Sequence, residues 1–201
     1  MGTYPWVANK MKTLEEAAAQ IGADMQLPED FLLNLKTEDD WSFVIKANVF
    51  LEALLSHAIT MSLHNPKVAP PISRLYMRDK IKIASALELI GPDGVKFLKQ
   101  MSSARNAAAH DISALAFSFP NVFENLDVNQ RKSRVTALAY FASEEDLRER
   151  WETVQKLVLS DTKQTIWWSL LHFTGVMWWK AEKAKLDTLN QLLQSRIKEQ
   201  G

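Results

Sequence analysis

The chain contains no cysteine and few residues that break helices, since only 6 of its 201 residues are glycine and 7 are proline. The lack of cysteine excludes disulfide bonds and thiolate metal sites. Its 24 basic and 24 acidic residues cancel, so no overall charge attracts it to nucleic acid. No basic region followed by an apolar one is visible at the N-terminus, and we therefore expect a cytoplasmic protein.

No segment alternates between apolar and polar residues as a strand does, and helical periodicity runs through nearly the whole chain. We therefore predict an all-α fold. Helices are expected at residues 10–21, shortly after Pro28, at 39–63, 73–90, from beyond Gly94 to about 110, and at 131–142, 144–160 and 161–198, with residues 111–130 irregular. We divide the chain into short N-terminal helices (1–38), a helical bundle (39–160) and a long Trp-rich helix (161–201) that packs on the bundle or on a partner.

The charges are unevenly distributed along the chain. Residues 1–40 hold 3 basic and 8 acidic side chains, whereas residues 74–110 hold 7 basic and 3 acidic side chains. The second stretch is therefore the part of the chain that best suits an anionic ligand.

The run Ser103–Asp111, which reads Ser-Ala-Arg-Asn-Ala-Ala-Ala-His-Asp, lies at the end of this basic stretch. Arg105 is a permanent cation that can hold a phosphate or a carboxylate. His110 titrates near neutral pH and can give or take a proton. Asn106 lies one helical turn before His110, within reach of the imidazole. Such a set can cleave RNA without a metal, so Arg105 and His110 are the candidate catalytic residues, and we expect no metal and no cofactor.

A purely structural role for this motif stays open. Arg105 can pair with Asp111 or with Glu52, and His110 can simply end a helix, where the helix dipole favours a cation. Five residues at about 100° each also place Arg105 and His110 roughly 140° apart on an ideal helix. Either the helix ends near His110, or one site combines the arginine and the histidine of two copies, as a two-fold dimer allows.

A polar line runs along the long helix that begins near residue 39. Asn48, Glu52 and Ser56 recur there at every fourth position. These three side chains either contact Arg105 and hold it in position, or they simply face solvent. We name Glu52, together with Asn106 and Asp111, as supporting residues of the candidate site.

Three segments match the pattern of a known family: Asp40–Ile45, Arg78–Ile90 and Ser103–Asp111. They resemble the HEPN superfamily (higher eukaryotes and prokaryotes nucleotide-binding), and within it the group around the mannitol operon repressor family. The resemblance implies an up-and-down helical bundle that pairs into a homodimer. Many relatives are metal-independent endoribonucleases of toxin–antitoxin or phage-defence systems, whereas the repressor-like relatives have no demonstrated cleavage chemistry.

Two hypotheses about function follow. The first is a dimeric HEPN-type endoribonuclease, a toxin or phage-defence effector, with RNA as substrate and an antitoxin or another protein as partner. The 2′-hydroxyl of RNA would attack the adjacent phosphorus and leave a 2′,3′-cyclic phosphate, with His110 as general base or acid and Arg105 stabilising the phosphoryl oxygens. The second is a non-catalytic helical regulator or interaction protein similar to the mannitol operon repressor family. The complete motif favours the first hypothesis, and the neutral net charge favours the second.

Residues 165–179 form an apolar segment with a pair of tryptophans at each end. At about 15 residues it is too short to cross a bilayer, which needs about 20, so we expect no membrane association. We expect Trp167 or Trp178 to anchor a subunit or partner interface, with an internal core as the alternative. The lysines that follow, Lys180, Lys183 and Lys185, are expected on the solvent side.

Overall fold

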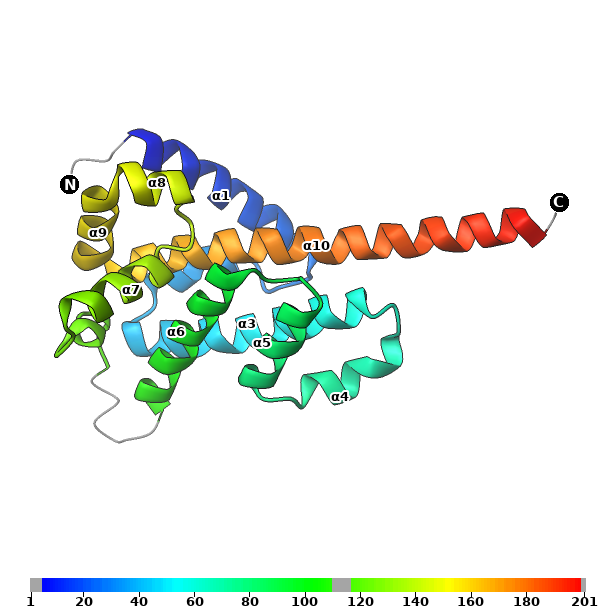
Figure 1. Cartoon of the computed structure of the whole chain (residues 1–201), viewed down its shortest axis with the longest axis horizontal. Coiled ribbons are helices and arrows are strands. Elements are labelled where there is room, and N and C mark those ends of the chain that lie inside the picture. The colour runs from blue at the N-terminus through cyan, green and yellow to red at the C-terminus, as the bar shows by residue number, and fades with distance from the viewer. Residues whose placement is uncertain (1–4, 110–116, 200–201) are drawn as a thin grey trace.

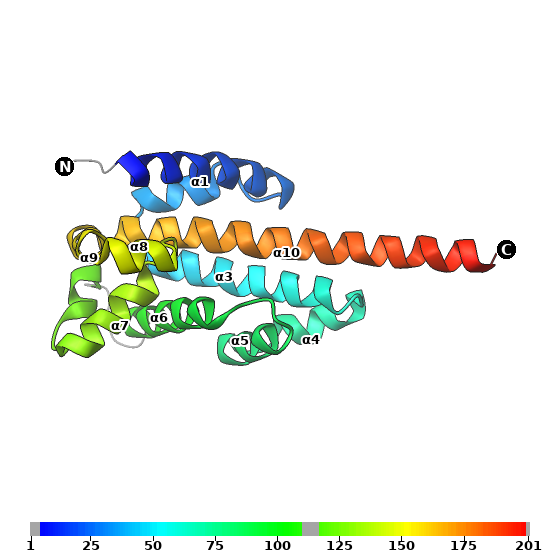
Figure 2. The same ribbon diagram turned by 45° about the horizontal axis from the view of Figure 1, so that its top comes forward.

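The computed structural model describes residues 5–109 and 117–199, and within these ranges the protein is helical and has no strand (Figure 1). The predicted all-α class is therefore confirmed. Two helices form its centre: α3 (Asp40–Ser62) packs along the first half of α10 (Thr162–Glu199). Figure 2 shows the layers, with α1 (Pro5–Asp24) on one side of α10, and α5 (Met77–Ala86) and α6 (Pro92–Ala109) beyond α3.

Shorter elements complete the described part of the chain. They are α2 (Phe31–Asn34), the 3-10 helices η1 (Leu35–Thr37), η2 (Pro66–Val68) and η4 (Phe119–Phe123), and the helices α4 (Ala69–Ser73), α7 (Val128–Leu138), α8 (Glu144–Glu149) and α9 (Trp151–Ser160). Helices α7 and α9 pack on each other and on α10, at the end of the molecule opposite to α4 (Figure 1).

Helix α3 begins and ends close to where its sequence predicts. The carboxylate of Asp39 accepts a hydrogen bond of 2.9 Å from the backbone N–H of Ser42, which caps the helix. Hydrogen bonds from Ser42 hold the pKa of Asp39 below its ordinary value. Helix α3 is long and apolar enough to cross a membrane by length and composition, with a mean hydropathy of 1.3, but 56% of that stretch is buried inside the protein. One such helix is weak evidence for a membrane span, because the core helix of a soluble protein passes the same test.

The predicted helix 73–90 is wrong in its bounds, because the chain bends at residues 74–76, between α4 and α5, and α5 already ends at Ala86. The bend exposes the backbone carbonyl of Ser73, which accepts a hydrogen bond of 3.1 Å from the buried Lys80 ammonium. Beyond α5, Glu88 has a left-handed backbone (φ 56°), and the ammonium of Lys180 donates to its carbonyl oxygen. The expectation that Lys180 faces only solvent is therefore also wrong.

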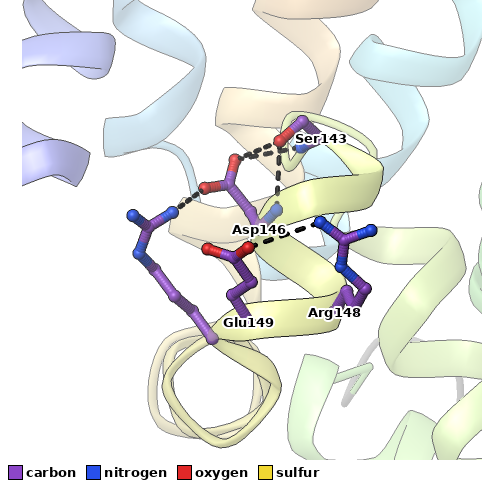
Figure 3. A network of polar contacts seen from close by, with 5 residues as sticks. Ser143, Asp146, Arg148 and Glu149 are labelled. Atoms are coloured by element: carbon purple, nitrogen blue, oxygen red, sulfur yellow. Dashed lines mark hydrogen bonds and ion pairs between the residues drawn. The ribbon is translucent and has the colours of Figure 1, made fainter.

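The predicted helix 144–160 is interrupted too. Arg150 leaves the helical conformation (φ −127°, ψ 28°) and separates α8 from α9. Its guanidinium donates a hydrogen bond of 2.6 Å to Asp146, whose backbone N–H and carboxylate also bond to Ser143 in a capping box (Figure 3). Nothing in the apolar periodicity signals this break, because α8 holds a single apolar residue, Leu147, and the buried residues Val154 and Val158 of α9 follow the break.

The Trp-rich segment lies in the first half of α10, and its tryptophans have different environments. Trp167 is fully buried, and its indole N–H donates a hydrogen bond of 2.7 Å to the carbonyl oxygen of Leu32. It has no surface to offer a partner, so the expectation that it anchors an interface is wrong, and the alternative of an internal core holds for this residue. Trp178 is half-buried and Trp179 is exposed.

Candidate functional site

An open groove of about 1070 Å³ lies where α3, α5 and α6 meet. Its walls come from three stretches of the chain: Asn48 and Glu52 on α3, residues 76–86 on α5, and residues 95–106 on α6. The motif residues Arg105 and Asn106 lie on the α6 wall. The groove is large enough for a ligand of several rings, since small-molecule sites have volumes of roughly 300–1,000 Å³.

Behind this groove a buried lysine joins two of its walls. Lys80 of α5 is 2% exposed, and its ammonium donates hydrogen bonds of 3.0 Å to the carboxylate of Glu52 and 3.1 Å to the carbonyl of Ser73. Glu52 therefore pairs with Lys80, and the alternative in which it pairs with Arg105 is wrong. Its carboxylate fixes α5 on α3 and so sets the shape of the groove.

We expect Lys80→Met to lower the free energy of unfolding by about 1–3 kcal/mol, because it keeps the apolar stem but leaves the Ser73 carbonyl and the half-exposed Glu52 without their donor. Urea unfolding measures the change. Lys82→Met, at an exposed position on the same helix, is the control and should change stability by less than about 0.5 kcal/mol. Equal losses in the two variants would contradict a structural role for the Lys80–Glu52 pair.

Two polar side chains lie low in the groove walls. Asn48 is 7% exposed, and its amide donates hydrogen bonds of 2.9 Å to the carbonyl of Val44 and 3.1 Å to that of Met101, so it joins α3 to α6. The hydroxyl oxygen of Ser102 is buried and has no hydrogen-bond partner in the described part of the chain. A buried hydroxyl without a partner is uncommon, and a water or a ligand group that enters the groove wall can satisfy it.

Four cations line the groove against the single carboxylate of Glu52: Arg78, Lys82, Lys99 and Arg105. The carboxylate of Asp79 approaches two of them, at 3.3 Å from Arg78 and 3.4 Å from Lys82. The hydrogen bond from Arg78, and then that from Lys82, hold the pKa of Asp79 below its ordinary value. Asp79 thus stays ionised and orients these two cations at one end of the groove, while Lys99 and Arg105 line the wall formed by α6.

Arg105 and Asn106 occupy the last described turn of α6. The guanidinium donates a long hydrogen bond of 3.4 Å to the Asn106 side chain, and both residues are exposed. The end of α6 is fixed to the start of α3, because the indole N–H of Trp41 donates a hydrogen bond of 2.8 Å to the carbonyl oxygen of Ala108. His110 and Asp111 lie outside the described residues, so their places relative to the groove stay predictions.

Sequence reasoning missed most of the groove. It named Arg105, Asn106 and Glu52 as site residues and placed Asn48 on the polar line of the long helix, but it assigned no site role to Tyr76, Lys99 or the remaining lining residues. The local excess of basic residues between 74 and 110 was the available signal, since all four groove cations fall inside it. Among the described residues, no group of three or more histidine, aspartate or glutamate side chains is arranged to hold a metal ion.

Comparisons of the chain with protein-family models, with curated proteins and with solved structures find no match.

Proposed function

We propose that the groove between α3, α5 and α6 binds RNA, and that Arg105 and His110 cleave the bound strand as in a HEPN-type endoribonuclease. The observation that carries this proposal is the charge of the groove. Four cations face one carboxylate there, in a chain whose net charge is zero. A local cluster of lysine and arginine beside an open groove is the usual footprint of a phosphate backbone.

The chemistry that we assign to the motif needs no metal, because RNA carries its own nucleophile. The 2′-hydroxyl attacks the adjacent phosphorus while the imidazole of His110 takes its proton, and the imidazolium that forms gives this proton to the departing 5′-oxygen. Arg105 is exposed on the groove wall and is free of any ion pair with a described residue, so its guanidinium is available for the phosphoryl oxygens. His110 follows α6 directly in sequence. In a homodimer, one site combines the histidine of one copy with the arginine of the other copy.

We expect Lys82→Gln/Lys99→Gln to weaken RNA binding at all sequences and to reduce the slope of log affinity against log salt by about 1.4, at about 0.7 per lost contact with a single strand. Fluorescence anisotropy with a labelled oligoribonucleotide over a range of salt concentrations measures both effects. The control Lys156→Gln removes an exposed lysine of α9 that does not line the groove, and its salt slope should equal that of the wild type. A double variant with an unchanged slope would contradict RNA binding in the groove.

One observation favours the second candidate, a non-catalytic regulator similar to the mannitol operon repressor family. No histidine lines the groove in the described part of the chain, and its carboxylate is already paired with Lys80. If His110 does not complete the site, the groove binds a strand but has no base to cleave it. RNA that stays intact while it is bound would identify this function.

If the protein does cleave RNA, we propose that it acts as a toxin or a phage-defence effector.

A further inference from the structure

The C-terminal part of α10 extends beyond the bundle (Figures 1 and 2). From Trp179 onward, four large apolar side chains of α10 are exposed, and we call them the α10 stripe: Trp179 (56%), Leu186 (58%), Leu189 (50%) and Leu193 (59%). Exposed apolar side chains are common singly, but four on one face of one helix form a continuous apolar strip.

The α10 stripe faces away from the rest of the protein. On the opposite side of the helix, Ala181 is buried and the hydroxyl of Thr188 bonds to the imidazole of His64. At about 100° per residue, Leu186 lies about 160° around the helix from Thr188 and Leu193 about 140°. The stripe therefore cannot turn onto the bundle while these contacts hold, and no described part of the chain covers it.

The spacing of the stripe is that of a coiled-coil seam. Trp179, Leu186 and Leu193 are seven residues apart, and Leu189 follows Leu186 by three, so they occupy a and d positions of a heptad repeat. The other two d positions carry opposite charges, Glu182 near the start of the stripe and Arg196 near its end.

We propose that the α10 stripe pairs with the same stripe of a second copy of this chain, in the antiparallel direction. Charge selects the direction. A parallel pair would place Glu182 against Glu182 and Arg196 against Arg196, and like charges that face each other across a seam are unfavourable. The antiparallel pair removes both repulsions.

The antiparallel register that covers the whole stripe sets Leu186 against Leu189 of the partner subunit, on both sides of a two-fold axis. Trp179 then meets Arg196 of the partner subunit, where a guanidinium over an indole is attractive. Leu193 lies along the aliphatic stem of Glu182 of the partner subunit, whose carboxylate is already 3.6 Å from the ammonium of Lys185 in its own chain. The lysines beside the seam, Lys183 and Lys185, face no lysine of the other helix in this register.

This dimer is independent of the proposed ribonuclease activity, because no residue of the α10 stripe lines the groove. Sedimentation velocity of the full chain tests it. We expect Leu186→Asn/Leu189→Asn to halve the sedimenting mass and to raise the dissociation constant of this contact by at least about 100-fold, since four leucines leave the seam. The control Leu159→Asn, at an exposed leucine of α9, should leave the mass unchanged. A monomeric wild type, or a double variant of unchanged mass, would overturn the proposal.

Cysteine cross-linking tests the direction of the pair. The chain has no cysteine of its own, so only the introduced residues can form a disulfide. Leu186→Cys and Leu189→Cys variants are oxidised separately and as a mixture. An antiparallel pair gives a disulfide-linked dimer mainly in the mixture, because residue 186 of one chain meets residue 189 of the other. Efficient linkage of either variant alone would indicate a parallel pair, and no linkage in the mixture would show that the stripes do not meet; each result would overturn the antiparallel assignment.

Discussion

Replacing Trp167 by alanine should lower the free energy of unfolding by about 3–5 kcal/mol, the usual cost of emptying a fully buried aromatic site. Trp167 is completely buried, its indole N–H bonds to the carbonyl of Leu32, and the ammonium of Lys36 lies 4.6 Å from the centre of its ring. The substitution therefore leaves a cavity between α10 and α2 and an unpaired carbonyl in the core. Thermal and urea unfolding measure the loss.

Two further variants make this prediction specific. Trp167→Phe keeps most of the ring and should cost less than Trp167→Ala, because it loses mainly the hydrogen bond to Leu32. Tyr76→Ala removes an aromatic side chain that is 79% exposed and should cost less than about 0.5 kcal/mol. A Trp167→Ala protein of nearly normal stability that fails to oligomerise would restore the interface role that its burial contradicts.

Arg105→Ala and His110→Ala should each reduce the rate of RNA cleavage by about 10²–10⁴-fold, the range expected when a charge-stabilising or proton-transferring group is lost. Arg105→Ala should change the melting temperature little, because Arg105 is exposed and makes no ion pair with a described residue. We expect the same of His110→Ala, because the role that we assign to His110 is proton transfer. Arg74→Ala is the matched control, since Arg74 is exposed and does not line the groove. A large fall in melting temperature would instead indicate that the motif is structural.

Mixing the two inactive proteins tests whether one site combines residues of two subunits. If Arg105 acts with His110 of the partner subunit, a mixed dimer has one complete site, and the mixture should recover about a quarter of the wild-type activity. If both residues act within one chain, mixing restores nothing. On an ideal helix, at about 100° per residue, Arg105 and His110 lie roughly 140° apart, which leaves a site within one chain and a site shared by two chains both open. Recovery of activity would show that the site is shared.

The parts of the fold that local sequence determines could be predicted. Helix α3 begins directly after Asp39 because that carboxylate caps it, and the long helix α10 continues to Glu199 because nothing in its sequence breaks it. The exposure of Arg105 near the end of α6 also agrees with its place in a basic, alanine-rich turn.

The parts that depend on contacts between distant segments could not be predicted. Lys80 belongs to a residue type that is almost never fully buried, and only the bend after Ser73 and the nearby Glu52 explain its burial. The partner of Trp167 is a carbonyl 135 residues away in sequence. The groove could not be predicted for the same reason. Its walls come from three helices, and apolar periodicity does not show how those helices are placed relative to one another.

The most direct test of the proposed function is the chemistry of the RNA ends. Purified wild-type protein is incubated with a labelled oligoribonucleotide in excess EDTA, beside His110→Ala, and the products are analysed by mass spectrometry. We predict fragments with 2′,3′-cyclic phosphate and 5′-hydroxyl ends in the wild-type reaction and their loss in the variant. Intact RNA in the wild-type reaction, or fragments with 3′-hydroxyl ends that appear only when Mg²⁺ is added, would contradict the assignment of this groove as a metal-independent ribonuclease site.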